Sequence, residues 1–180
     1  MQLPLARPDI TDLEIAYVNK VLTTPNLSMG PMVKEFEDRL AAYIGCKYAI
    51  AVNSGTSGLH TCVIASGIES GDSVITTPFS FVASANCILY ERAIPVFVDI
   101  DSDTLNIDPQ KTADKVREME AAGKAVKAIL PVHIFGQPSD MDPIMETASQ
   151  HDLVVIEDAC EAIGAEYNGR RVGTFGLAAV

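Results

Sequence analysis

The sequence predicts an α/β fold, with a mostly parallel sheet flanked by helices. Short apolar runs rich in β-branched residues alternate with helical patterns, as expected for strands joined by helical crossovers. Some runs are apolar at consecutive positions, as at residues 154–156, which is typical of strands covered on both faces. No repeat, low-complexity stretch or Gly/Ser linker interrupts this alternation, so residues 1–180 are expected to form one domain.

The first half of the chain is predicted to contain four helices and two strands. Apolar residues at three- and four-residue intervals, and turn residues at the ends, indicate the helices. Helices are expected over residues 12–22, 33–44, 58–66 and 80–90. Strands are expected over residues 48–52 and 73–76, the first of them buried, and the Pro- and Gly-containing residues 25–31 are expected to form a loop.

The second half continues the pattern with three strands and two helices. The strands are expected over residues 95–100, 125–133 and 153–157, and the helices over residues 112–122 and 141–151. In an open α/β sheet, ligands bind outside the carboxyl ends of the strands. That rule selects four segments: the turn at 53–57, residues 76–81, the surroundings of His133, and the pair Glu157 and Asp158.

Composition excludes several classes of partner. The chain has 13 basic and 24 acidic residues, a net charge of −11, which argues against binding nucleic acid or an anionic membrane. No apolar run reaches the roughly 18 residues of a membrane span, and residues 1–12 lack the apolar core of a signal peptide. The four cysteines are far apart, with no metal-binding or disulfide spacing, so we expect reduced, mostly buried thiols in a cytoplasmic protein.

The turn at residues 54–58 is a candidate phosphate site. Gly55 lets the backbone approach a ligand, the amide groups of a helix start point outward, and Thr56 and Ser57 add hydroxyl donors. The segment is neither a P-loop nor a dinucleotide fingerprint. The alternative is that its Ser and Thr residues only cap the helix.

The other three segments each allow two interpretations. An aromatic at residues 76–81 either stacks on a flat ligand ring or belongs to the core. Asp158 either caps a following helix or pairs with a cationic ring nitrogen, while His133 is expected to be a satisfied core residue. Alternating aspartates at 99–103 lack the glycine and glutamate of a calcium loop, so we expect a solvated turn and no metal. A phosphate turn, an aromatic and a ring-nitrogen carboxylate together indicate a phosphorylated aromatic cofactor.

With these motifs in place, the chain resembles the N-terminal half of the DegT/DnrJ/EryC1/StrS family of pyridoxal-phosphate-dependent nucleotide-sugar aminotransferases of fold type I. The matching segments occur in order at residues 27–31, 53–59, 77–83, 98–101, 131–136, 157–165 and 172–176. The resemblance implies the large domain of an aspartate-aminotransferase-like fold. It also implies a reaction in which an amino group passes from an amino acid, expected to be glutamate, to a nucleotide-linked keto sugar in a homodimer.

The resemblance also assigns roles to individual residues. Gly55, Thr56 and Ser57 match the turn that holds the cofactor phosphate. Phe81 matches the aromatic that stacks on the pyridine ring, Asp158 the carboxylate on the ring nitrogen, and Glu161 a polar neighbour of the cofactor. The loop residues Leu27, Ser28 and Met29 match a segment near the sugar substrate.

The chain departs from the family in two ways, and the first of them leads us to expect no activity from these residues alone. The family's Schiff-base lysine is expected beyond Val180, together with a small C-terminal domain, so we expect an incomplete domain without turnover of its own. Leu177 stands where the family commonly has Asp. The dehydratase branch of the family, in which histidine replaces the lysine, stays an alternative. A non-catalytic truncated relative and an unrelated nucleotide-binding α/β domain are further alternatives.

Overall fold

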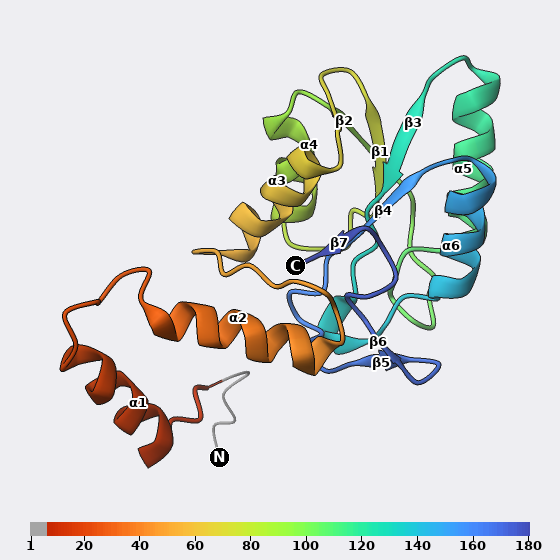
Figure 1. Ribbon diagram of the computed structural model, residues 1–180. Coiled ribbons are helices and arrows are strands. Elements are labelled where there is room, and N and C mark those ends of the chain that lie inside the picture. The colour runs from red at the N-terminus through yellow and green to blue at the C-terminus, as the bar shows by residue number, and fades with distance from the viewer. Residues whose placement is uncertain (1–6) are drawn as a thin grey trace.

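A five-stranded parallel sheet lies at the centre of the computed structural model, which describes residues 7–180 (Figure 1). Its strands follow the order β2-β1-β3-β4-β7, and each neighbouring pair is parallel. In that order they span Ile94–Phe97, Ser73–Thr76, Val126–Ile129, Val154–Glu157 and Ala178–Ala179. The predicted fold class, an α/β fold with a mostly parallel sheet, is therefore confirmed.

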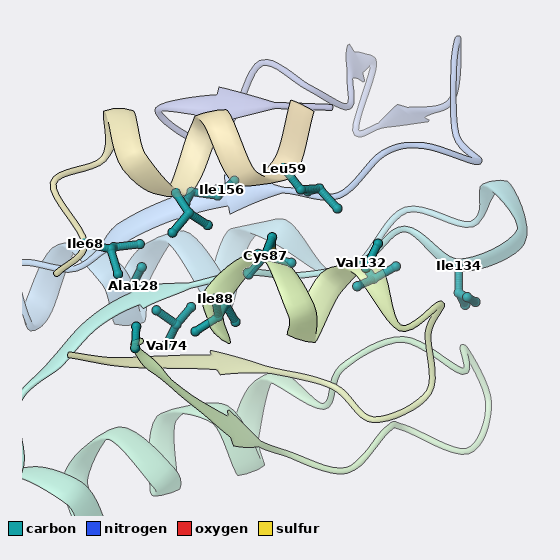
Figure 2. Close-up of a cluster of buried hydrophobic side chains, with 13 residues drawn as sticks. Leu59, Ile68, Val74, Cys87, Ile88, Ala128, Val132, Ile134 and Ile156 are labelled. Atoms are coloured by element: carbon teal, nitrogen blue, oxygen red, sulfur yellow. The ribbon is translucent and has the colours of Figure 1, made fainter. Parts of the chain in front are cut away.

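Two pairs of helices cover the two faces of the sheet (Figure 1). Helices α3 (Gly55–Ala65) and α4 (Ala83–Tyr90) lie on one face, and α5 (Pro109–Ala121) and α6 (Met141–Gln150) lie on the other. Side chains from consecutive strand positions enter opposite cores because they point to alternate faces. Val74 and Ile156 pack with Leu59 beneath α3 and α4 (Figure 2), whereas Ile75 and Val155 pack beneath α5 and α6.

The two N-terminal helices form as predicted but bury little surface. Helix α1 (Asp12–Leu22) begins with a capping box in which the Thr11 N–H donates to Glu14 at 2.6 Å. Helix α2 (Pro31–Ile44) ends at Gly45, whose φ of 89° is the left-handed conformation that glycine favours. Neither helix has a fully buried residue, and Figure 1 shows both standing apart from the sheet.

The predicted buried strand at residues 48–52 is wrong. The segment is irregular and exposed, with Tyr48 73% and Ile50 78% accessible. A strand needs a neighbouring strand to satisfy its backbone, whereas here the backbone bonds to side chains: the Ala51 N–H donates to the Glu37 carboxylate at 2.9 Å, and the Tyr48 carbonyl accepts from the Cys46 thiol at 3.2 Å. The apolar composition of residues 48–52 favours a strand, but no strand of the described chain pairs with this segment.

Other elements shift their ends for local reasons. Helix α4 begins at Ala83 rather than 80, strand β2 stops at 97 rather than 100, and β3 stops at 129 rather than continuing to His133. Pro131, which lacks an N–H, follows the end of β3, and only an isolated bridge between Val132 and Asp158 continues the pairing. Helix α5 starts at Pro109 rather than 112, because Asp108 caps it and accepts from two amides at 2.9 and 3.0 Å.

Three short strands near the C-terminal end are not predicted from the sequence. Strands β5 (Glu166–Tyr167) and β6 (Arg170–Arg171) form an antiparallel hairpin, and β7 joins the edge of the main sheet beside β4. Each is two residues long, too short for a period-two pattern. Of the helices in residues 7–180, none combines the length and the apolar character that crossing a membrane requires.

Gly176 approaches strand β4 more closely than any side chain would allow. A Cβ at this position would lie 2.4 Å from the Val155 carbonyl oxygen and 2.9 Å from its carbon, which are backbone atoms in the middle of the sheet. We expect Gly176→Ala to lower the free energy of unfolding by about 2–4 kcal/mol, measured by urea denaturation. Ala178→Gly, in the adjoining strand β7, is the control, and an equal loss in both variants would contradict this explanation.

Candidate functional site

The candidate site lies where the order of strands reverses. The chain passes from β1 to its neighbour β2 and then returns to the other side of β1 to form β3. Carboxyl ends of parallel strands on either side of such a switch leave a crevice that ligands occupy. The segments that follow β1, β3 and β4 carry Phe81, His133 and Asp158, so the topology brings three of the four nominated segments to one edge of the sheet.

The turn at residues 53–57 starts helix α3, and Ser54 is its N-cap. The Ser54 hydroxyl oxygen accepts from the Ser57 N–H at 3.2 Å and lies 3.0 Å from the Ser57 hydroxyl. The capping interpretation is therefore correct for Ser54. It leaves the N–H groups of Gly55 and Thr56 without an acceptor among residues 7–180, so both remain available to an anion at the positive end of the helix.

Gly55 brings this turn against the segment that carries Asp158. A Cβ at Gly55 would lie 2.8 Å from the Cys160 sulfur, so a larger residue would push the two segments apart. Cys160 is two residues beyond Asp158, and its N–H lies 3.4 Å from Asp158 Oδ1. The phosphate-binding candidate and the ring-nitrogen candidate therefore lie side by side, although they are about a hundred residues apart in the sequence.

Asp158 is a buried carboxylate at the carboxyl end of β4. Its side chain accepts a 2.6 Å hydrogen bond from the hydroxyl of Ser84, and its own backbone carbonyl accepts from His133 N–H at 2.9 Å. A turn rather than a helix follows Asp158, and its Oδ1 lies 3.4 Å from the Cys160 N–H within that turn, so Asp158 caps the turn that follows it and not a helix. One carboxylate oxygen is held by Ser84, and the hydrogen bonds within residues 7–180 give Oδ1 the weak contact from the Cys160 N–H, with the thiol of the same residue nearby.

Phe81 is exposed, as a ligand-stacking residue should be. It is 74% accessible, so the alternative in which this aromatic belongs to the core is wrong. Its carbonyl lies 3.3 Å from the hydroxyl of Ser84, the same residue that binds Asp158. Phe79, two residues earlier, packs edge-on against Phe135 at 6.1 Å between ring centroids. The backbone of Phe81 thus contacts the serine that binds Asp158, and the stacking of its ring on a cofactor stays a prediction.

Glu161 contacts the neighbouring loop. Its carboxylate accepts a hydrogen bond from the Phe135 N–H at 2.9 Å. Phe135 lies in the short 3-10 turn η1 (Ile134–Gly136) with φ of 52°, a strained conformation for a non-glycine residue. Glu161 therefore holds the loop after β3 beside the turn after β4, and its place next to a cofactor stays a prediction.

The loop residues Leu27, Ser28 and Met29 lie between α1 and α2, away from the sheet (Figure 1). Leu27 and Met29 are 66% and 86% exposed. Among the described residues they make no hydrogen bond to the segments that carry Gly55, Phe81 or Asp158. Their role near a substrate stays a prediction.

His133 is a satisfied core residue, as expected. Its Nδ1 accepts from the Ser139 N–H at 3.0 Å, which places the ring proton on Nε2, 3.2 Å from the Glu157 carboxylate. Both side chains are fully buried. The histidine thus has a hydrogen-bond partner at each ring nitrogen, the Ser139 N–H at Nδ1 and the Glu157 carboxylate at Nε2.

Glu157, nominated together with Asp158, has a structural role that its place in the sequence does not reveal. Its carboxylate accepts from the N–H groups of Gly173, Phe175 and Gly176 at 2.7–2.8 Å, in addition to His133. Burial alone would raise the pKa of this carboxyl, but the hydrogen bonds from His133, Gly176 and Gly173 outweigh it and hold the pKa below its ordinary value. The available signal was a second acid beside Asp158 at the end of an apolar strand.

The structure also describes the aspartate turn at residues 99–103 and the four cysteines. Asp101 accepts from the N–H groups of Asp103 and Thr104 at 3.0 and 2.9 Å, so the aspartates form the expected turn. Within residues 7–180, no group of three acidic, histidine or cysteine side chains is placed to hold a metal ion. The four cysteines are free, but only Cys87 is buried, and Cys160 is exposed.

These residues fit pyridoxal phosphate. The close approach of Gly55 to Cys160 and the unpaired amides of Gly55 and Thr56 suit a phosphate group. Asp158 suits a protonated ring nitrogen, because a buried carboxylate with one oxygen left open needs a cationic or N–H partner. The cofactor, when bound, supplies an electron sink for chemistry at the carbon next to an amino group.

Comparisons with known proteins identify the family of this chain. The DegT/DnrJ/EryC1/StrS aminotransferase family matches residues 8–180. The GDP-perosamine synthase of Caulobacter vibrioides is 43% identical over 176 residues, covering 97% of this chain and 46% of the relative. An aminotransferase from Psychrobacter cryohalolentis is 38% identical with a TM-score of 0.85, covering 96% and 43% of the two chains. A GDP-4-keto-6-deoxymannose-3-dehydratase with bound GDP-perosamine is 32% identical with a TM-score of 0.91, covering 99% and 46%.

The chain belongs to the DegT/DnrJ/EryC1/StrS aminotransferase family. The family and its members in pyridoxal-phosphate form indicate pyridoxal phosphate as the cofactor. The chain spans less than half the length of the relatives it matches.

Proposed function

We propose that this chain forms the cofactor-binding face of a pyridoxal-phosphate-dependent aminotransferase that acts on a nucleotide-linked keto sugar, with glutamate as the amino donor. The observation that carries the proposal is the contact between two distant segments. The open amides at the start of α3 lie against Cys160, two residues from the buried carboxylate of Asp158. Hydrogen-bond donors for the phosphate and an acceptor for the ring N–H are thereby held on one surface.

Each residue has a distinct task in this proposal. Gly55 and Thr56 donate backbone N–H groups to the phosphate, and the Thr56 hydroxyl adds a donor. Ser57 helps to shape the turn, since its N–H already bonds to Ser54. Phe81 stacks on the ring, Asp158 keeps the ring nitrogen protonated, and Glu161 holds the adjoining loop.

Amino transfer also needs a lysine amine as covalent anchor and proton carrier. Several lysines in residues 7–180 bond to their own surroundings, such as Lys34 to Asp38, Lys111 to the Ile100 carbonyl and Lys115 to Glu118. None of these bonds joins a lysine to the candidate cofactor face, and by family resemblance we propose that the 180 residues bind the cofactor without a covalent bond and do not turn over alone. A second copy of the chain and a cytoplasmic location complete the proposal by family resemblance.

A dehydratase that acts on a nucleotide-linked keto sugar is the second candidate. Its support is the structural likeness to the GDP-4-keto-6-deoxymannose-3-dehydratase, which carries the higher TM-score of the two structures compared above. The residues on the present cofactor face suit both reactions, because both need the same phosphate and ring-nitrogen contacts.

The proposal is tested by native mass spectrometry of the chain with pyridoxal phosphate, before and after borohydride reduction. We expect one cofactor per chain, lost on denaturation and not fixed by borohydride. Asp158→Ala should weaken binding by about ten- to a hundred-fold, because a charge-assisted hydrogen bond is lost. Asp114→Ala, which removes an exposed carboxylate on α5, is the control.

Three results would contradict the proposal. Absence of binding by a chain that circular dichroism shows to be folded would exclude this cofactor face. A borohydride-stable adduct would show that a lysine of this chain anchors the cofactor. Equal weakening by the Asp158 and Asp114 variants would remove Asp158 from the site.

A further inference from the structure

Helix α4 supplies a second layer of contacts behind Asp158. Ser84, in the first turn of this helix, is 1% exposed, and its hydroxyl donates to Asp158 Oδ2 at 2.6 Å. Ser80 lies one turn earlier, partly buried, with its hydroxyl 2.7 Å from that of Ser84. Two hydroxyl groups therefore stand in line behind one carboxylate oxygen.

The direction of the two hydrogen bonds follows from the donor count. A serine hydroxyl has one proton, and the short contact to an ionised carboxylate is preferred to the 3.3 Å contact between Ser84 and the Phe81 carbonyl. Ser84 therefore donates to Asp158. Its oxygen is then free to accept, so the Ser80 hydroxyl donates to Ser84.

We propose that Ser84 is a positioning residue for the cofactor, and that Ser80 supports it. This inference rests on the proposed function, in which Asp158 binds the ring nitrogen. Ser84 fixes Oδ2, so that Oδ1 is the oxygen left for a ligand; in the part of the chain that the structure describes, its neighbours are the Cys160 N–H at 3.4 Å and the adjacent Cys160 thiol. Oδ1 is then the oxygen that meets the N–H of the ring. Without Ser84, the carboxylate is free to rotate and loses this orientation.

The test compares two probes with the whole chain. One is pyridoxal phosphate, and the other is 1-deazapyridoxal phosphate, in which a C–H group replaces the ring nitrogen. The ratio of the two dissociation constants isolates the ring-nitrogen contact, because both probes carry the same phosphate. The titrations follow the absorption of the bound ring, so no turnover is needed.

We expect wild type to prefer pyridoxal phosphate by about ten-fold or more, and Asp158→Asn to bring the ratio close to one. Ser84→Ala should reduce the preference by about three- to ten-fold and leave the affinity for the deaza probe unchanged. Ser80→Ala should reduce it by about two-fold. Ser139→Ala is the matched control, since this serine is equally buried but donates to the Val132 carbonyl.

Each outcome decides the inference. A wild-type ratio in Ser84→Ala, with the ratio lost in Asp158→Asn, would overturn the role of Ser84 and leave the proposed function intact. Equal affinity of wild type for the two probes would overturn both. If Ser84→Ala does not fold, as judged by circular dichroism, Ser80→Ala decides, and an unchanged ratio in that variant would exclude the hydroxyl pair.

Discussion

Replacement of Glu157 by alanine is expected to lower the free energy of unfolding by about 3–5 kcal/mol, the largest effect on stability that we predict for this chain. The substitution removes one carboxylate but leaves several buried donors without an acceptor. Three of these are the N–H groups of Gly173, Phe175 and Gly176, and the fourth is the ring N–H of His133. Urea denaturation followed by circular dichroism measures the loss.

A second glutamate–histidine pair in the same chain provides the matched control. The Glu120 carboxylate lies 2.9 Å from His151 Nδ1, but its side chain is 46% exposed. Water replaces such a contact, so Glu120→Ala should cost only about 0–1 kcal/mol. Similar losses in the two variants would contradict the view that desolvated donors, rather than the pairing itself, determine the cost.

The contribution of Glu157 should also depend on pH. Hydrogen bonds in the folded chain hold the pKa of this carboxyl below its ordinary value of 4.5, so the folded state favours the ionised form. The stabilisation is therefore fully present above pH 4.5 and is lost as the pH falls through the lower, folded pKa. The difference in stability between wild type and Glu157→Gln should narrow over that acidic range. A difference that stays constant with pH would show that the charge of Glu157 is unimportant.

The helices and central strands could be predicted because their signals are local. The Thr11 to Glu14 capping box, Gly45 and the Asp108–Pro109 pair each determine an end of a helix through neighbouring residues. The segment at residues 48–52 shows the limit of such signals. Its apolar composition suits a strand, but pairing depends on a neighbour from elsewhere in the chain, which composition does not encode.

Some residues of the candidate site could likewise be predicted from local sequence, and others could not. Gly55 and Asp158 could be nominated because a strand-to-helix turn and an acid at the end of a buried strand are visible in the sequence. Ser84 could not, since a serine on a helix has no distinguishing neighbours and acquires its role only through a contact 74 residues away. The cost of burying a carboxylate was applied to Asp158 alone, although it applies equally to Glu157.

The thiol of Cys160 offers a test of the site that needs no cofactor. Burial raises the pKa of this thiol, and the charge of the adjacent Asp158 and a hydrogen bond to it raise the pKa further, to about 12 from an ordinary 9.0. Only the thiolate reacts with alkylating reagents, so an increase of this size sharply reduces the reactive fraction at neutral pH. Because the residue is exposed, water screens part of the effect, and we expect alkylation about a hundred-fold slower in the folded chain than in urea.

Removal of the neighbouring charge should restore part of the reactivity. Asp158→Asn keeps the shape of the side chain and removes two of the causes that raise the pKa of Cys160, but burial remains. Alkylation with iodoacetamide, resolved by mass spectrometry of the peptide that contains Cys160, should therefore become several-fold faster in the folded variant. Asp140→Asn removes an acid whose oxygen bonds to Tyr167 instead, and should leave the rate unchanged. Equal rates in wild type and Asp158→Asn would mean that the thiol does not lie beside this carboxylate, and the contact that joins the start of α3 to Asp158 would then be wrong.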